Sequence, residues 1–401
     1  MMRRALSRLF AGDRHFVMTR GLSAVLALGF ALLYSKQLGV ERRGLLTLVM
    51  TTNLVFSILL ISGISLHLRN LARNDESRES LGNYLSLVFL FSLLTPILNL
   101  FVLEAYQDIF NTGIPNNLTY ISFMYCFFST LSFGMHDALL LIKSIKVASI
   151  LDIGVLMIQI LGYFTLVYVG ETSYFVSVLI AISVSYLVMV FASLILIFYI
   201  YNPPLKLSWR TTVRLFKESS TPFLVTVTGQ LLERIDKVFI GFLTSSAELG
   251  RFSTSQSIFG VARFLPDSLT KLSMARDKNF ISRTRNFSLL AIFAIPAIFI
   301  LAGIVSFLVK VVLGEEWMLS ITVLVGIALV ELLRSIHSVV TMNVIRANRY
   351  KMLQSITVIQ LIVGLLLQPI AIYWMGIEGS IISGIVLLTF GLISMKSYFR
   401  V

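Results

Sequence analysis

The sequence predicts an all-helical membrane protein that crosses the bilayer twelve times, and three observations predict it. First, 57% of the 401 residues are hydrophobic and only 13% are charged, whereas a soluble domain has roughly 45–50% apolar and about 25% charged residues. Second, stretches of about 20 mostly apolar residues, the length that spans the hydrocarbon core as a helix, follow one another along the chain. Third, lysine and arginine are concentrated in alternate connections between these stretches.

The apolar stretches place the twelve predicted spans. They lie at 18–38, 44–68, 81–103, 118–142, 147–169, 174–200, 220–243, 249–271, 287–312, 318–344, 351–374 and 377–396. The eighth of these is unusually polar, with the sequence FSTSQSIFGVARFLPDSLTKL over most of its length. A span of this kind has to be sheltered by other helices or has to line water.

The distribution of positive charge predicts the orientation. The connections on the side of the N-terminus hold 24 of the 33 lysines and arginines, and the opposite connections hold 5. Positive charge is retained in the cytoplasm, so both termini are expected there, as an even number of spans requires. The net charge of +13 is therefore interpreted as a signal of membrane orientation, and nucleic acid is not an expected partner.

A shift of 206 positions aligns glycines in the two halves of the chain. Gly44 falls on Gly250 and Gly170 falls on Gly376, while two basic connections also fall near each other. These matches predict two halves of six spans each. Because six is even, both halves would have the same topology and form parallel repeats related by a pseudo-two-fold axis along the membrane normal. The expected division is an N-terminal lobe at 1–200, a cytoplasmic linker at 201–219 and a C-terminal lobe at 220–401. Residues 1–17 form either an interfacial amphipathic helix or a disordered basic tail.

Four charged residues lie close together in the seventh span, namely Glu233, Arg234, Asp236 and Lys237. Each charge at the centre of a bilayer costs about 2.5–3.5 kcal/mol on insertion scales, so such groups face a protein interior or a wet cavity. Two interpretations compete. The cluster is either a set of internal ion pairs, or Arg234 and Lys237 bind an anion while Asp236 or Glu233 couples transport to an ion.

Short motifs resemble a known family. The pair Asp236–Lys237, the following apolar run, the loop at Glu248–Gly250 and the aromatic Phe252 resemble the junction of the seventh and eighth helices in polysaccharide flippases. The hairpin Leu38–Gly44 and the later Gly63–Ser65 resemble the first hairpin of the same proteins. These flippases belong to the multidrug/oligosaccharidyl-lipid/polysaccharide exporter superfamily.

The resemblance implies a twelve-helix, two-lobe flippase in the bacterial inner membrane. It implies that an oligosaccharide repeat unit on polyprenyl pyrophosphate moves from the cytoplasmic to the outer leaflet by alternating access, for O-antigen of lipopolysaccharide or for exopolysaccharide. Membrane lipids, a polysaccharide polymerase and a chain-length regulator are the further expected partners. One alternative is a drug or cation antiporter of the same fold. A membrane polymerase or glycosyltransferase has less support, because such enzymes typically carry a large external loop and the longest one here, 104–117, is short.

Further charges in the spans are candidate site residues. Arg263, near the middle of the eighth span, either contacts phosphate or sugar, for which its bidentate fork is suited, or pairs with Asp267. Arg334 either binds substrate or pairs with Glu331. The last candidates, Arg20 and Asp137, lie near the ends of spans and are open to the same choice between a functional and an interfacial role.

The sequence shows no pattern typical of an enzyme. The four histidines lack metal-ligand spacing, no phosphate-binding loop is present, and the single cysteine, Cys126, excludes an intrachain disulfide. We therefore expect no catalytic residues, no metal site and no cofactor.

Overall fold

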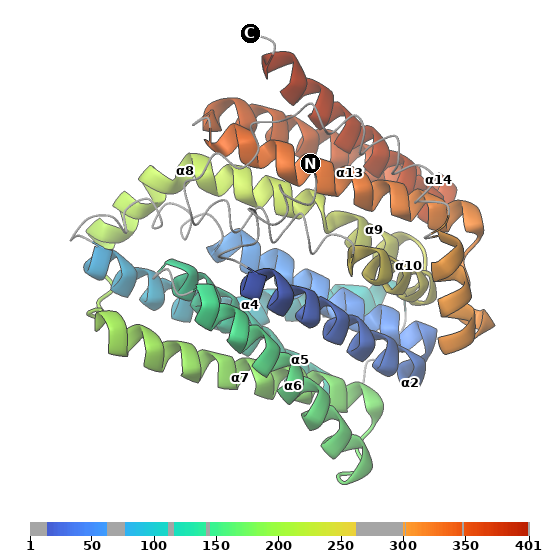
Figure 1. Cartoon of the computed structure of the whole chain (residues 1–401), viewed down its shortest axis with the longest axis horizontal. Helices are drawn as coiled ribbons and strands as arrows, with labels where there is room; N and C mark the ends of the chain where they lie inside the picture. The colour runs from blue at the N-terminus through green and yellow to red at the C-terminus, as the bar shows by residue number, and fades with distance from the viewer. Residues whose placement is uncertain are drawn as a thin grey trace. The chain divides into compact units, whose positions relative to one another are not determined.

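The described part of the chain consists of helices joined by turns and short connections (Figure 1). The computed structural model describes residues 14–61, 77–110, 116–141, 145–261, 300, 302–346 and 349–399, and no strand occurs in these ranges. The helices are α2 (Arg14–Ile61), α4 (Ser77–Phe110), α5 (Asn116–Leu141), α6 (Ile145–Tyr168), α7 (Tyr174–Tyr201), α8 (Trp209–Leu232), α9 (Ile235–Leu243), α10 (Ser246–Gly260), the 3-10 turn η3 (Glu315–Trp317), α13 (Ile321–Arg346) and α14 (Tyr350–Phe399). A shorter apolar helix covers Ala302–Val312.

Two of these helices are each long enough for two crossings. In the described residues, six helices are long and apolar enough to cross a membrane, and the segments Met18–Ile61 and Tyr350–Met395 contain 44 and 46 residues. Gly39 in α2 (φ 75°, ψ 170°) and Gly376 in α14 (φ 58°, ψ −135°) have non-helical backbone. Positive φ is accessible to glycine at little cost, so each glycine divides its helix where the sequence predicts a boundary between spans.

The predicted seventh span departs from the expectation of one continuous helix. It consists of α8 and α9, separated by a turn at Glu233 and Arg234. Helix α8 also begins at Trp209, within the stretch 201–219 that the sequence predicts to be a linker. The Ser208 hydroxyl caps this helix by accepting a hydrogen bond from the Thr211 amide at 3.4 Å.

The chain forms two compact units. One unit comprises 1–45 and 239–401, and the other comprises 46–238. In the 46–238 unit, α5 packs against both α4 and α7, and α6 packs against α7. In the other unit, α13 packs against α14 and α10. The predicted division into lobes on either side of 201–219 and the full count of twelve spans remain predictions.

Within the unit of 1–45 and 239–401, α2 and α10 meet backbone to backbone at two glycines. A Cβ atom added to Gly44 would lie 1.7 Å from the carbonyl oxygen of Ser246, and one added to Gly250 would lie 2.1 Å from that of Val40. The shift of 206 positions relates Gly44 to Gly250 and also Val40 to Ser246. The contact is therefore reciprocal, as it is across a two-fold axis, and only glycine permits the approach.

Candidate functional site

The break between α8 and α9 carries the four charges predicted for the seventh span. Glu233 follows the last residue of α8, and the Arg234 amide donates a hydrogen bond to the Leu231 carbonyl at 2.9 Å. The Lys237 amide donates to the Arg234 carbonyl at 3.1 Å, which begins the next helix. Interrupted spans leave backbone dipoles at membrane depth, and in transporters such places hold ions and substrates.

One of the four charges has an evident local role. Asp236 is buried, with 3% of its surface exposed, and lies in the first turn of α9. Its Oδ1 accepts a hydrogen bond from the Lys237 amide at 2.7 Å. A carboxylate at a helix N-terminus is stabilised by the helix dipole. Asp236 therefore helps to form the break, and this role is separate from the predicted one of coupling transport to an ion.

A second group of charges joins α10 to α13 in the unit of 1–45 and 239–401. The Arg334 guanidinium donates to Glu331 Oε1 at 2.7 Å, and only 6% and 5% of the two side chains are exposed. The Gln256 amide of α10 donates to the same oxygen at 3.1 Å. The predicted ion pair is present. The part played by Gln256 could not be derived from spacing, because it comes from another helix.

The polar surface of α13 continues from this ion pair towards α14. The Thr341 hydroxyl lies 3.4 Å from His337 Nδ1, and Gln360 donates from its amide to the Leu387 carbonyl at 2.8 Å. A Cβ on Gly391 would lie 2.2 Å from the Gln360 nitrogen and 3.0 Å from His337 Nε2. Glycine at position 391 thus leaves space for the polar side chains between α13 and α14.

The 46–238 unit contains a different kind of polar cluster, in which every member is uncharged. Thr52 of α2 donates to Asn99 of α4 at 2.5 Å, and Asn99 donates to the Cys126 sulfur of α5 at 2.9 Å. One turn further along, Ser57 of α2 and Thr130 of α5 are 2.8 Å apart. Hydrogen bonds between membrane helices of this type hold the helices together, so the cluster is a structural element of this unit.

Three further site residues that the sequence predicts are Asp137, Arg20 and Arg263. His136 of α5 is 3.2 Å from Asp152 of α6, beside the partly exposed Asp137. Arg20 is half-buried on the first part of α2. Arg263 and its expected partner Asp267 lie outside the described residues. In the described part of the chain, no group of three histidine, cysteine or acidic residues could hold a metal ion.

Long apolar helices, glycine breaks and buried charges within the spans define a multi-pass membrane protein. Among the solved structures that share the fold is the lipid II flippase MurJ in an inward closed conformation, with 14% sequence identity over 96% of this chain and 87% of that chain and a TM-score of 0.74. Another is the Vibrio cholerae MATE transporter VcmN, with 11% identity over 99% of this chain and 98% of that chain and a TM-score of 0.66. A third is the eukaryotic MATE transporter AtDTX14, with 12% identity over 99% of this chain and 96% of that chain and a TM-score of 0.66. All belong to the multidrug/oligosaccharidyl-lipid/polysaccharide exporter superfamily. At these identities, the likeness establishes the fold alone.

The family follows from the sequence match. The model of the family described as polysaccharide biosynthesis protein matches residues 15–265, which is more than half of the chain. The chain therefore belongs to the polysaccharide biosynthesis protein family, and the resemblance found in its motifs is confirmed. No curated protein matches the sequence.

Proposed function

We propose that this protein is a flippase that moves a polyprenyl-pyrophosphate-linked oligosaccharide repeat unit from the cytoplasmic to the outer leaflet of the bacterial inner membrane by alternating access. Both termini are placed in the cytoplasm by this proposal. The product serves O-antigen or exopolysaccharide assembly, where a polymerase and a chain-length regulator would act next. Membership of the polysaccharide biosynthesis family supports this substrate class over a drug.

The observation that carries the proposal is the interrupted span between α8 and α9 with its two cations. A sugar pyrophosphate cannot cross about 30 Å of hydrocarbon unaided, and its path needs cations for phosphate and hydrogen-bond donors for sugar. Arg234 and Lys237 supply the cations at the break, and Asp236 helps to fix its geometry. Outward movement of an anion across a negative-inside potential is favoured by about 2.3 kcal/mol per charge per 100 mV, which contributes to the driving force.

The test is deletion of the gene in its native host, followed by complementation. Deletion should abolish surface polysaccharide and cause lipid-linked repeat units to accumulate facing the cytoplasm. Wild type should restore the polysaccharide, and Arg234→Gln with Lys237→Gln should not, at matched protein level. The control with the same charge change is Lys36→Gln with Arg42→Gln, since both side chains are exposed on α2, and it should complement fully.

Two results would overturn the proposal. Normal surface polysaccharide in the deletion strain together with greater drug sensitivity would assign the protein to the exporters of the same fold. Full complementation by the Arg234 and Lys237 variant would remove the break from the substrate path. Arg234→Lys with Lys237→Arg keeps both charges and should restore part of the activity, which separates loss of charge from loss of folding.

A further inference from the structure

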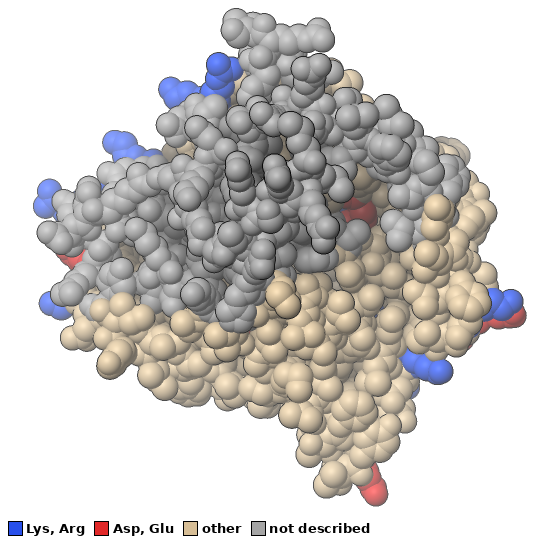
Figure 2. Space-filling view, in the orientation of Figure 1, with Lys and Arg blue, Asp and Glu red and all other residues tan. Residues whose placement is uncertain are grey.

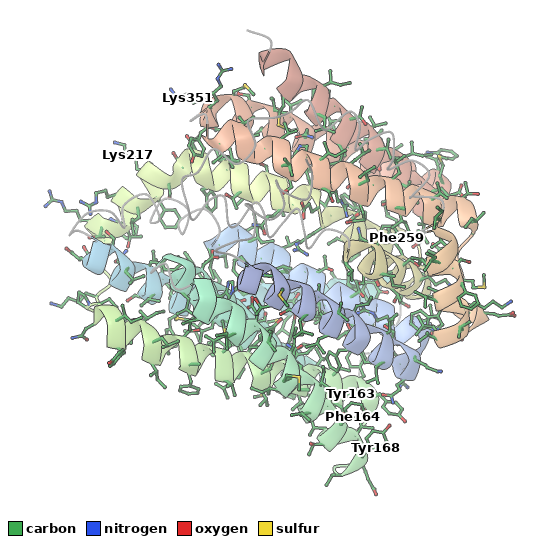
Figure 3. All side chains as sticks on the ribbon, viewed as in Figure 1. Tyr163, Phe164, Tyr168, Lys217, Phe259 and Lys351 are labelled. Carbon is green, nitrogen blue, oxygen red and sulfur yellow. The ribbon has the colours of Figure 1, made fainter. Side chains whose placement is uncertain are left out.

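The beginning of α8 and the segment before it form a surface of mixed character. Apolar and basic side chains alternate here, and all of them are exposed. We call this set the linker–α8 surface, and it consists of Leu205, Lys206, Leu207, Trp209, Arg210, Val213, Arg214 and Lys217. Trp209 is 80% exposed, while Leu205 and Leu207 are 57% and 56% exposed. Figure 3 labels Lys217 pointing away from α8, and Figure 2 shows blue side chains projecting at the margin where α8 begins.

The linker–α8 surface is held firmly on α4. The Asn83 side chain accepts a hydrogen bond from the Ser208 amide at 2.8 Å and donates to the Thr212 hydroxyl at 3.0 Å. A Cβ on Gly82 would lie 1.9 Å from the Pro204 carbonyl oxygen, so the linker backbone rests directly on α4. The opposite face of α8, at Thr211, Thr212, Leu215 and Ser219, is buried. The exposed face is therefore a fixed feature of the 46–238 unit.

The position of the linker–α8 surface relative to the membrane follows from the span that precedes it. Tyr174–Ile200 is long and apolar enough to cross a membrane, and its end carries Tyr199, which is 89% exposed. The linker–α8 surface begins five residues after this span ends. Tyrosine and tryptophan are enriched where a span meets the aqueous phase. The surface therefore follows the end of a candidate span by only five residues, where the headgroup region is expected.

The composition of the linker–α8 surface fits neither water nor hydrocarbon alone. A water-facing segment does not need an exposed tryptophan that closely follows two exposed leucines, and a lipid-facing span does not tolerate four cations. In the described residues, Lys206, Arg210 and Lys217 form no ion pair with an acidic side chain. Basic residues beside tryptophan and leucine are typical of segments that lie in the membrane interface.

We propose that the linker–α8 surface is a binding site for anionic phospholipid headgroups. The cations contact the phosphates, while Trp209 and the two leucines enter the boundary with the acyl chains. The bound lipid fixes the start of α8, a helix of 24 residues whose other end is the break at Glu233 and Arg234. Anionic lipid thus anchors the helix that carries the charged break, and this role is independent of the transported substrate.

The experiment measures binding of phosphatidylglycerol and phosphatidylcholine to the purified full-length protein by native mass spectrometry. The surface variant is Lys206→Gln, Arg210→Gln and Lys217→Gln. The control variant is Lys36→Gln, Arg42→Gln and Lys351→Gln, which removes three exposed cations elsewhere. Each cation near a membrane raises lipid affinity about fivefold, so the surface variant should bind phosphatidylglycerol on the order of 100-fold more weakly. Phosphatidylcholine binding should not change, and the control should match wild type.

A second measurement does not need the surface variant to fold. Trp209 should be quenched by brominated lipid in vesicles, and Trp209→Phe should remove that component of the quenching. Equal phosphatidylglycerol affinity in the surface and control variants would overturn the proposal, as would Trp209 fluorescence that brominated lipid does not quench. Displacement of phosphatidylglycerol by millimolar inorganic phosphate would assign the surface to soluble anions and would overturn it too.

Discussion

The glycine contact between α2 and α10 gives a quantitative prediction about stability. Replacement of Gly44 by alanine places a methyl group 1.7 Å from the Ser246 carbonyl oxygen, and replacement of Gly250 places one 2.1 Å from the Val40 oxygen. Both obstacles are backbone atoms, so no side chain can rotate away. Ordinary van der Waals contact begins at 3.4 Å. The two helices would therefore have to separate by about 1.5 Å to relieve the overlap between the added methyl group and the carbonyl oxygen.

The free-energy cost of that separation can be estimated. Overpacking a well-filled contact typically costs about 1–3 kcal/mol. A gap of about 1 Å also removes up to about half of the dispersion attraction of the atoms on either side. Leu249 and Phe252, which are 1% and 3% exposed, lie on α10 beside the contact. We expect each alanine variant to be destabilised by about 3 kcal/mol.

The double variant distinguishes one shared contact from two separate sites. Once α2 and α10 have separated for the first alanine, the second fits into the space already opened. Gly44→Ala with Gly250→Ala should therefore cost only about 1 kcal/mol more than either change alone, a departure from additivity of about 2 kcal/mol. The measurement is the midpoint of unfolding in detergent for both single variants and the double variant.

The same two helices provide the control substitutions. Gly29 of α2 and Gly260 of α10 have nothing within 4 Å of an added Cβ. Alanine at these positions should be neutral or should stabilise the helix by up to about 1 kcal/mol. If Gly44→Ala were as stable as Gly29→Ala, or if the two contact variants were additive, the backbone contact between α2 and α10 would be refuted.

Two further predictions concern charges in the spans. Arg334→Gln leaves the buried Glu331 carboxylate without its cation and should destabilise the protein by about 3–5 kcal/mol, whereas Glu331→Gln combined with Arg334→Met should recover most of the loss. Thermal unfolding in detergent measures the stability of both variants. Equal unfolding midpoints for the single and the double variant would refute the importance of the Glu331–Arg334 ion pair. Arg263→Ala should abolish surface polysaccharide at matched protein level, and Arg263→Lys should retain part of it. Rescue of Arg263→Ala by Asp267→Ala would instead identify a structural ion pair.

Helices were predictable from the sequence because hydrocarbon leaves the backbone no alternative. A spanning segment must satisfy its own amides and carbonyls, so an apolar stretch of sufficient length is sufficient evidence for a helix. The division of α2 at Gly39 and of α14 at Gly376 follows the same reasoning, since each lies at or beside the predicted end of a span. The orientation of the termini and the lobe boundaries depend on charge and on repeats, and they stay predictions.

The break between α8 and α9 could not be predicted in the same way. Glu233 and Lys237 are four residues apart, a spacing that suits an unbroken helix with an ion pair as well as it suits the turn that is present. The deciding contacts, including the bond from Arg234 to Leu231, are local backbone choices that periodicity does not reveal. Gln256 was missed for another reason, because its partner Glu331 is 75 positions away.

The shift of 206 positions separates the parts of the two halves that are alike from those that differ. Gly44 and Gly250 are identical and meet at a contact that no other residue would allow. By contrast, the same shift places Arg263 opposite Ser57, and Ser57 is a buried hydroxyl in a neutral cluster, 2.8 Å from Thr130. Backbone contact between repeats requires the same small residue on both sides, whereas an anionic substrate requires cations only along its path. Under the proposed function, a cation at position 263 therefore needs no counterpart at position 57 in the other half.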